Sequence, residues 1–172
     1  MALLNILTYP NPFLGIPADP VENVDDSIRK LINDMAETML DAPGIGLAAP
    51  QVRCGKQVIV YAEPKEKRKT PFDVLINPVI VASSGQTVSE KEGCLSVPEL
   101  NANVKRAESI VVTGLDREGK PVRIKTDGLL SIILQHEIDH LRGVLFLDRI
   151  SALKRGFYKK RVQKRIKNEK KA

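Results

Sequence analysis

The chain has 172 residues, of which 42% are hydrophobic, and it carries a formal net charge of +6. This length can bury one sizeable core but hardly two, so we expect a single catalytic or binding domain over residues 1–172. No basic residue precedes Arg29 and no apolar run is long enough to cross a bilayer, which argues against a targeting segment or a membrane protein and predicts a cytoplasmic one.

The first predicted element is an amphipathic helix over about residues 26–41. It follows the start signal Asp25-Asp26 and ends at Pro43-Gly44. Its apolar residues recur at helical spacing and predict a face that packs on the core: Ile28, Leu31, Ile32, Met35, Met39 and Leu40.

Strand-like runs follow over residues 57–61, 74–82, 110–115 and 122–125, the last two joined by a hairpin turn at 116–120. A second helix is predicted over about residues 129–141, with Thr126 or Asp127 as its cap and Gly143 after its end. Helices separated by runs of strands, without regular alternation, predict an α+β fold with an antiparallel sheet.

Both histidines of the chain lie in one pentapeptide of the second helix, His136-Glu137-Ile138-Asp139-His140. Positions i and i+4 share one face of a helix, so both imidazoles can reach one ion while Glu137 projects beside it as a base. The pattern indicates a metallohydrolase.

The third metal ligand has several candidates. The chain has no other histidine. Two carboxylates follow the motif, but Asp148 lies only eight residues after His140 and Glu169 lies in the charged tail. Cys94 is the better candidate, although taken alone it would be interpreted as a small buried hydrophobe. One thiolate and two imidazoles leave a position open for water, as in a catalytic site, and they suit Zn²⁺, Fe²⁺, Co²⁺ or Ni²⁺.

Three segments together resemble the peptide deformylases: Gly44-Ile45-Gly46-Leu47-Ala48-Ala49-Pro50-Gln51, then Glu92-Gly93-Cys94-Leu95-Ser96, then Gln135-His136-Glu137-Ile138-Asp139-His140. The resemblance implies antiparallel β-sheets packed around a central helix that carries the HExxH motif, with a C-terminal helix. It also implies an enzyme that removes the N-formyl group from the N-terminal methionine of newly synthesised proteins and releases formate.

The same resemblance implies the roles of the site residues. Cys94, His136 and His140 would hold the ion, usually Fe²⁺, with Ni²⁺, Co²⁺ or Zn²⁺ able to substitute. A metal-bound water would attack the formyl carbon, and Glu137 would take its proton and deliver it to the departing amine. The oxyanion would be bound by the Gln51 side-chain amide and the Leu95 backbone N–H.

Two groups of residues are expected to bind the N-formylmethionyl peptide. The segment Gly44-Ile45-Gly46 could pair with an extended peptide by strand addition, although from the residues alone a plain turn is favoured. Leu129, Ile132 and Ile133 could line an apolar pocket for methionine; without the metal they would be ordinary core. Asp139 would either orient a ligand or form a surface pair.

The C-terminal tail is strongly basic. Ten of the 27 Lys and Arg residues lie in residues 151–172, against one of the 21 acidic residues. Leu153, Phe157, Val162 and Ile166 predict the apolar side of a helix over about residues 151–170. The helix is either a solvated amphipathic one or, as the resemblance implies, a docking element for ribosomal RNA. We expect a monomer.

Two rival functions are considered. A zinc endopeptidase would use the same pentapeptide but would need its usual third ligand. A non-catalytic RNA-binding domain with a structural metal would use the tail and could dispense with Glu137.

Overall fold

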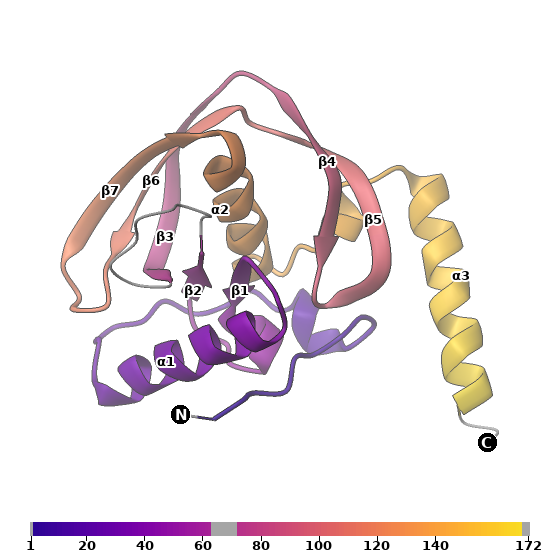
Figure 1. Cartoon of the computed structure of the whole chain (residues 1–172), viewed down its shortest axis with the longest axis horizontal. Helices are drawn as coiled ribbons and strands as arrows, with labels where there is room; N and C mark the ends of the chain where they lie inside the picture. The colour runs from indigo at the N-terminus through magenta and orange to yellow at the C-terminus, as the bar shows by residue number, and fades with distance from the viewer. Residues whose placement is uncertain (1, 63–71, 170–172) are drawn as a thin grey trace.

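Helix α2 lies at the centre of the molecule, between two antiparallel sheets (Figure 1). The computed structural model describes residues 2–62 and 72–169. Its helices are α1 (Asp26–Asp41), α2 (Gly128–Leu141) and α3 (Ala152–Glu169), with short 3-10 turns η1 (Pro12–Gly15), η2 (Ala49–Val52) and η3 (Phe146–Asp148). Its strands are β1 (Gly46–Ala48), β2 (Val58–Tyr61), β3 (Asp73–Ser84), β4 (Thr87–Cys94), β5 (Val97–Arg106), β6 (Ser109–Leu115) and β7 (Pro121–Asp127).

The strands form two sheets. Five of them follow the order β1-β2-β3-β6-β7, and β4 pairs with β5 in a separate hairpin; every pairing is antiparallel. Figure 1 shows β3, β6 and β7 on one side of α2, the β4–β5 hairpin on the other, and α1 beneath. The predicted α+β fold, with antiparallel sheets around a central helix and a helix at the C-terminal end, is confirmed.

The composition of α2 explains its central position. Ten of its 14 residues are buried, five of them apolar and packed in the core and the other five polar. Asp127 stands at its N-cap position, but within the described chain its side chain makes no capping hydrogen bond, and Thr126 bonds the Asp127 carbonyl. The predicted cap position at Asp127 is therefore confirmed, without a capping bond from its side chain, and the predicted stop at Gly143 is confirmed by a φ of 71°.

Helix α1 has the predicted bounds and cap. The Asp25 side chain accepts a hydrogen bond from the backbone N–H of Ile28 at 3.0 Å. Ile32, Met35 and Met39 are fully buried and pack against β1 and β2. This packing fixes α1 beneath the edge of the five-stranded sheet, where the chain turns into β1.

The β4–β5 hairpin is the main element that the sequence did not predict. Strand β4 is rich in charged residues and ends in Gly93-Cys94, and β5 contains Pro98 and two asparagines, so neither has a strong strand signature. The hairpin forms because its two halves pair with each other and because Val97 and Val104 are buried in a cluster with Phe146.

Helix α3 docks on the molecule differently from the prediction. Tyr158 and Val162 are its buried residues, and the Tyr158 hydroxyl donates to the Pro98 carbonyl at 3.0 Å. Leu153 and Phe157, which were predicted to share the apolar face, are 69% and 65% exposed. In the described part of the chain, no helix combines the length and the hydropathy needed to span a membrane.

Candidate metal centre

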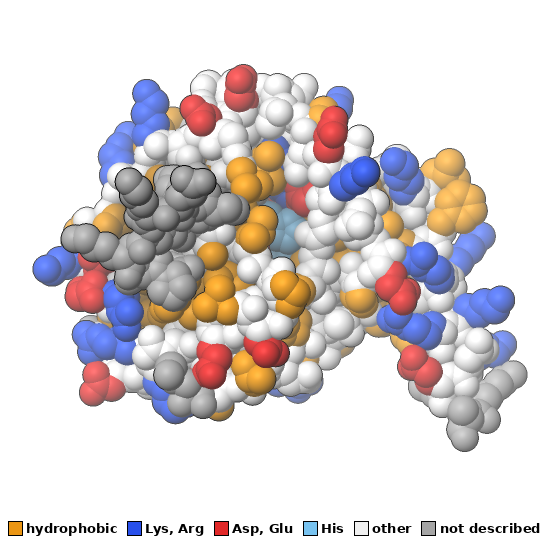
Figure 2. Space-filling view, in the orientation of Figure 1, with side chains coloured by type: hydrophobic (Ala, Val, Ile, Leu, Met, Phe, Trp, Pro, Cys, Tyr) orange, Lys and Arg blue, Asp and Glu red, His pale blue; other side chains and the backbone are white. Residues whose placement is uncertain are grey.

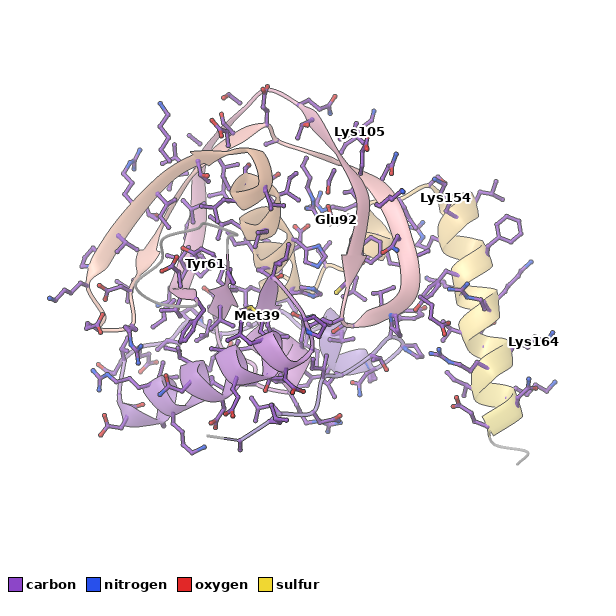
Figure 3. The ribbon with its side chains drawn as sticks, viewed as in Figure 1. Met39, Tyr61, Glu92, Lys105, Lys154 and Lys164 are labelled. Carbon is purple, nitrogen blue, oxygen red and sulfur yellow. The ribbon has the colours of Figure 1, made fainter. Side chains whose placement is uncertain are left out.

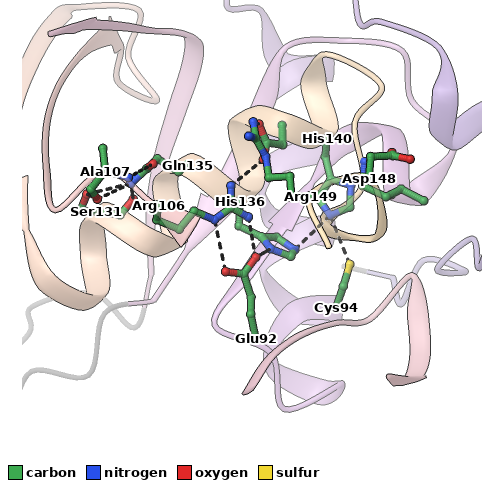
Figure 4. A network of polar contacts seen from close by, with 12 residues as sticks. Glu92, Cys94, Arg106, Ala107, Ser131, Gln135, His136, His140, Asp148 and Arg149 are labelled. Carbon is green, nitrogen blue, oxygen red and sulfur yellow. Dashed lines mark hydrogen bonds and ion pairs between the residues drawn. The ribbon is translucent and has the colours of Figure 1, made fainter. Parts of the chain in front are cut away.

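Three side chains from two elements converge on one point. Cys94 is the last residue of β4, and His136 and His140 lie one turn apart on α2. The Cys94 Sγ lies 3.2 Å from His140 Nε2, which in turn lies 3.3 Å from His136 Nε2 (Figure 4). All three potential ligand atoms are within 4.8 Å of one another. The structure therefore brings together the three residues predicted to hold the ion.

These distances suit a metal ion. Two nitrogens bound at ~2.0–2.1 Å to one tetrahedral ion lie about 3.3 Å apart, because the ligand–metal–ligand angle is near the tetrahedral value. The observed Nε2–Nε2 separation has this length. The alternative ligands are engaged elsewhere: the Asp148 carboxylate accepts from the Leu145 backbone N–H, and Glu169 pairs with Arg165 at the end of α3.

The electrostatics of the two imidazoles also suit a cation. Burial lowers the pKa of His140 well below its ordinary value, so this ring is neutral and its lone pair is available to a metal. Burial opposes a charge on His136 as well, but hydrogen bonds to Cys94 and Glu92 outweigh it and raise the His136 pKa. A metal ion between Cys94, His136 and His140 would take the place of the His136 proton that faces Cys94.

The second nitrogen of His136 is fixed by Glu92. The distance from His136 Nδ1 to a Glu92 carboxylate oxygen is 2.7 Å, and Glu92 points from β4 toward α2 (Figure 3). Burial would raise the pKa of Glu92, but hydrogen bonds from His136 and Arg106 outweigh it and hold that pKa at about 2. Glu92 therefore remains an acceptor and orients His136 so that Nε2 faces Cys94 and His140.

Sequence reasoning missed Glu92 and Arg106 as parts of the site. Glu92 stands two residues before Cys94. Because residues i and i+2 of a strand point to the same face, this spacing could have indicated that Glu92 lies near the ligand. Arg106 is distant in sequence and gave no such signal. Asp139 is 4% exposed and paired with Arg106 and Arg149, so the surface-pair interpretation of Asp139 is wrong.

The Glu137 side chain is buried next to the metal ligands. Among the residues that the structure describes, its Oε2 has no hydrogen-bond partner. Its carboxylate lies against the backbone of Gly46, where a Cβ would overlap with it. Burial raises the pKa of Glu137 to about 7, which places this group between acid and base near neutral pH.

Gln51 is held with its amide nitrogen toward the thiol. Its Oε1 accepts from the Ala48 backbone N–H at 2.8 Å, while Nε2 donates to Ser96 Oγ at 3.0 Å and lies 3.7 Å from Cys94 Sγ. The assignment of the two amide atoms follows from this network, because only the oxygen can accept from Ala48. Leu95 follows Cys94 and lines the same space.

A cavity of about 500 Å³ opens at the metal centre, where Cys94 and His136 line it. It is lined by all the residues predicted to contact a peptide, and Figure 2 shows the histidine at its floor with hydrophobic side chains around it. These residues are Gly44, Ile45, Gly46, Leu129, Ile132 and Ile133.

Two strand edges border this cavity. Strand β1 is the end strand of its sheet, and β4 has a partner on one side, β5. Gly46 begins β1, which pairs with β2, and the Ile45 carbonyl accepts a hydrogen bond from the Ala62 backbone N–H at 2.9 Å. An edge strand presents unpaired backbone groups to which an extended peptide can bond. The chain turns at residues 42–43, and of the segment Gly44-Ile45-Gly46 only Gly46 belongs to the edge strand β1.

Comparison with known proteins gives a single result. Residues 3–156 match the family model described as polypeptide deformylase. A peptide deformylase from Desulfosudis oleivorans is 53% identical over 97% of this chain and 96% of its own length. The crystal structure of a peptide deformylase from Legionella pneumophila superposes with a TM-score of 0.89 at 44% identity, covering 99% of both chains.

A third similarity concerns a bound peptide. The Met-Ala-Ser-bound crystal structure of a class I type b peptide deformylase from Acinetobacter baumannii superposes with a TM-score of 0.80 at 35% identity, covering 87% of this chain and 99% of that one. The family model matches residues 3–156, and the Desulfosudis relative is 53% identical over 97% of the chain. Both agree with the three motifs and with the Cys–His–His geometry. The chain belongs to the polypeptide deformylase family.

Proposed function

We propose that this protein removes the formyl group from the N-terminal methionine of nascent peptides in the cytoplasm, with Fe²⁺ as its native ion. One observation carries the proposal: Cys94, His136 and His140 converge beside a cavity that Cys94, His136 and Glu137 line, and within the described residues the buried Oε2 of Glu137 has no hydrogen-bond partner. Residues 1–172 would act as one catalytic domain.

The ion would be held by Cys94, His136 and His140, and when bound it supplies the Lewis acidity that makes a water nucleophilic near neutral pH. The mixed thiolate and imidazole set favours a borderline metal over a hard one such as Mg²⁺. A thiolate ligand at the floor of an open cavity is also exposed to oxidation, which supports anaerobic purification.

Glu137 would accept a proton from the attacking water and return it to the nitrogen of the departing methionine. Cleavage of the amide requires this second transfer, because an unprotonated amine is a poor leaving group. Two features support the assignment: the raised pKa of about 7 and the absence of a hydrogen-bond partner for Oε2 among the described residues.

The oxyanion would be bound by the Gln51 side-chain amide and the Leu95 backbone N–H. Gln51 is preorganised for this role, since Ala48 and Ser96 fix the orientation of its amide. The location of Leu95 beside Cys94 supports its part in the same contact.

The peptide would extend along the edge of β1, bonded to the backbone of Gly44-Ile45-Gly46, with its methionine side chain on Leu129, Ile132 and Ile133. The edge position of β1 and the cavity lining support this orientation. The bound Met-Ala-Ser peptide of the Acinetobacter relative supports a substrate of this class.

The experiment that tests the proposal measures formate release from formyl-Met-Ala-Ser by anaerobically purified protein, before chelation, after chelation and after return of Fe²⁺ or Ni²⁺. Release that is lost with the metal and restored by it is expected. Cleavage of an internal, unformylated peptide without formate release would favour the endopeptidase alternative.

For α3, we propose docking on ribosomal RNA through its exposed basic side chains, with the enzyme acting as a monomer. Lys154 and Lys164 lie on α3 where the helix stands beside the body of the molecule (Figure 3). Truncation would remove Tyr158 and Val162 from the core, so paired Lys154→Glu and Lys164→Glu substitutions are the better test. Ribosome binding should fall while hydrolysis of a short formyl peptide is retained; unchanged binding would refute the docking.

A further inference from the structure

A continuous chain of ion pairs leads from His136 to the surface (Figure 4). His136 contacts Glu92 at 2.7 Å, and the Arg106 guanidinium donates to both oxygens of Glu92 at 2.5 and 3.2 Å. Arg106 also donates to Asp139 Oδ2 at 2.6 Å. Arg149 completes the chain with two bonds to the Asp139 carboxylate, each of 2.5 Å.

The two carboxylates of this chain are paired with two guanidinium groups, those of Arg106 and Arg149. Glu92 and Asp139 are both negative, and their side chains are 6% exposed. Arg106, which is 1% exposed, can neutralise one of them. A buried carboxylate without a counter-charge is strongly unfavourable, and Arg149, whose side chain is 41% exposed, supplies Asp139 with a second guanidinium partner.

The position of Arg149 is tied to His136 by a second route. Arg149 is the C-cap residue of η3, and its backbone N–H donates to the Phe146 carbonyl at 3.0 Å. Phe146 is 1% exposed, and its ring stacks on His136 with the centroids 6.1 Å apart and the planes at 30°. The same short turn therefore supplies a packing contact to the His136 ring and the guanidinium for Asp139.

Arg106 divides its donors between two carboxylates. Its Nε and one terminal nitrogen bond Glu92, and the other terminal nitrogen bonds Asp139. Without Arg149, the Asp139 carboxylate would keep Arg106 as its sole described counter-charge and would compete with Glu92 for it. A weaker hold on Glu92 would loosen the orientation of His136, since Glu92 fixes that ring through Nδ1.

We propose that Arg149 is a positioning residue for the metal ligand His136, acting through Asp139, Arg106 and Glu92. The inference rests on the proposed metal site. Its consequence is that a partly exposed side chain outside the cavity sets the affinity for the ion without contacting the ion or the peptide.

The test compares Arg149→Met, which removes the charge, with Arg149→Lys, which keeps the charge but loses the two-pronged contact. Arg165→Met is the matched control, because Arg165 is 40% exposed and its ion pairs with described residues are long, at 3.7 and 4.0 Å. For each protein, Ni²⁺ affinity is measured by competition with a chelator, and the absorption spectrum of the Co²⁺ form reports the geometry of the ligands. Melting temperatures are recorded with and without Ni²⁺.

We expect Ni²⁺ affinity to fall about tenfold in Arg149→Met, as for other residues that support metal ligands, and less in Arg149→Lys. The Co²⁺ spectrum should shift in the first variant, and KM for formyl-Met-Ala-Ser should stay within about twofold of wild type, since Arg149 does not line the cavity. Arg165→Met should match wild type throughout.

A different pattern would overturn the proposal. If Arg149→Met lowered the melting temperature equally with and without Ni²⁺ and bound Ni²⁺ like wild type, Arg149 would be a structural residue only. Should Arg149→Met fail to fold, unchanged affinity and spectrum in Arg149→Lys would have the same meaning. Failure of wild-type protein itself to bind Ni²⁺ would instead remove the proposed metal site, and this inference with it.

Discussion

The carboxylate of Glu137 lies against the backbone of Gly46, so closely that a Cβ at residue 46 would overlap with it. The contact joins the central helix α2 to the edge strand β1, and it fixes the proton-transfer group in relation to the strand proposed to bind the peptide. Gly46 is needed here for the close approach of a side chain.

Gly46→Ala should therefore impair activity more than folding. The methyl group would displace the Glu137 carboxylate, and since general acid–base catalysis contributes typically ~10²–10⁴-fold, we expect kcat to fall by about 10²-fold with the metal retained. Formate release at saturating peptide measures it. Gly156→Ala on α3, where a Cβ meets nothing within 4 Å, is the control and should keep wild-type kcat. Equal activity of the two variants would contradict the role of this contact.

The docking of α3 predicts a large loss of stability at one aromatic residue and almost none at its neighbour. Tyr158 is 3% exposed and Phe157 is 65% exposed. Tyr158→Ala should lower the free energy of unfolding by about 3–5 kcal/mol, since it removes a buried aromatic ring and its bond to Pro98. Phe157→Ala should change it by less than about 0.5 kcal/mol. Urea unfolding of both variants measures the difference, and similar losses would mean that α3 docks differently.

How far the sequence predicts this molecule depends on the range of the interactions. The bounds of α1 and α2 follow from local periodicity and end signals, and the two histidines follow from their spacing on α2. Cys94 could be selected because few other ligands exist. The three motif segments each carry local information, and the structure brings them to one cavity.

Other features depend on contacts between distant residues. Arg106 pairs with Glu92, 14 residues away in sequence, and Arg149 pairs with Asp139, 10 residues away. Nothing in the local sequence of either arginine indicates these partners. The β4–β5 hairpin forms despite weak local preference because it completes the cluster around Phe146. The apolar face of α3 was predicted in part: Val162 and Ile166 pack on the body with Tyr158, whereas Leu153 and Phe157 are exposed.

Acid stability should depend on Asp34. Its side chain is buried, and a hydrogen bond from Lys30, together with the backbone N–H of Ala2, holds its pKa below the ordinary value of 3.8. A carboxylate with a lowered pKa stabilises the fold above its unfolded pKa, and this stabilisation is lost as the pH falls through the folded pKa. Metal-free wild type should therefore lose melting temperature below about pH 4, over the range that begins at that ordinary value.

Asp34→Asn should melt at a lower temperature at pH 7 and show a smaller decline on acidification. Melting curves of the metal-free proteins from pH 7 to low pH check this. Glu118→Gln, at an exposed carboxylate in the β6–β7 turn, is the control and should follow the wild-type curve. An Asp34→Asn curve parallel to wild type would contradict the assignment.

The central claim is that Glu137 transfers the proton while Cys94, His136 and His140 hold the ion. The most direct measurement is formate release from formyl-Met-Ala-Ser by wild type and Glu137→Gln, with metal content determined on the same anaerobic samples. We expect equal metal content and a kcat for Glu137→Gln that is lower by ~10²-fold or more. Wild-type turnover by the metal-loaded Glu137→Gln protein would contradict it.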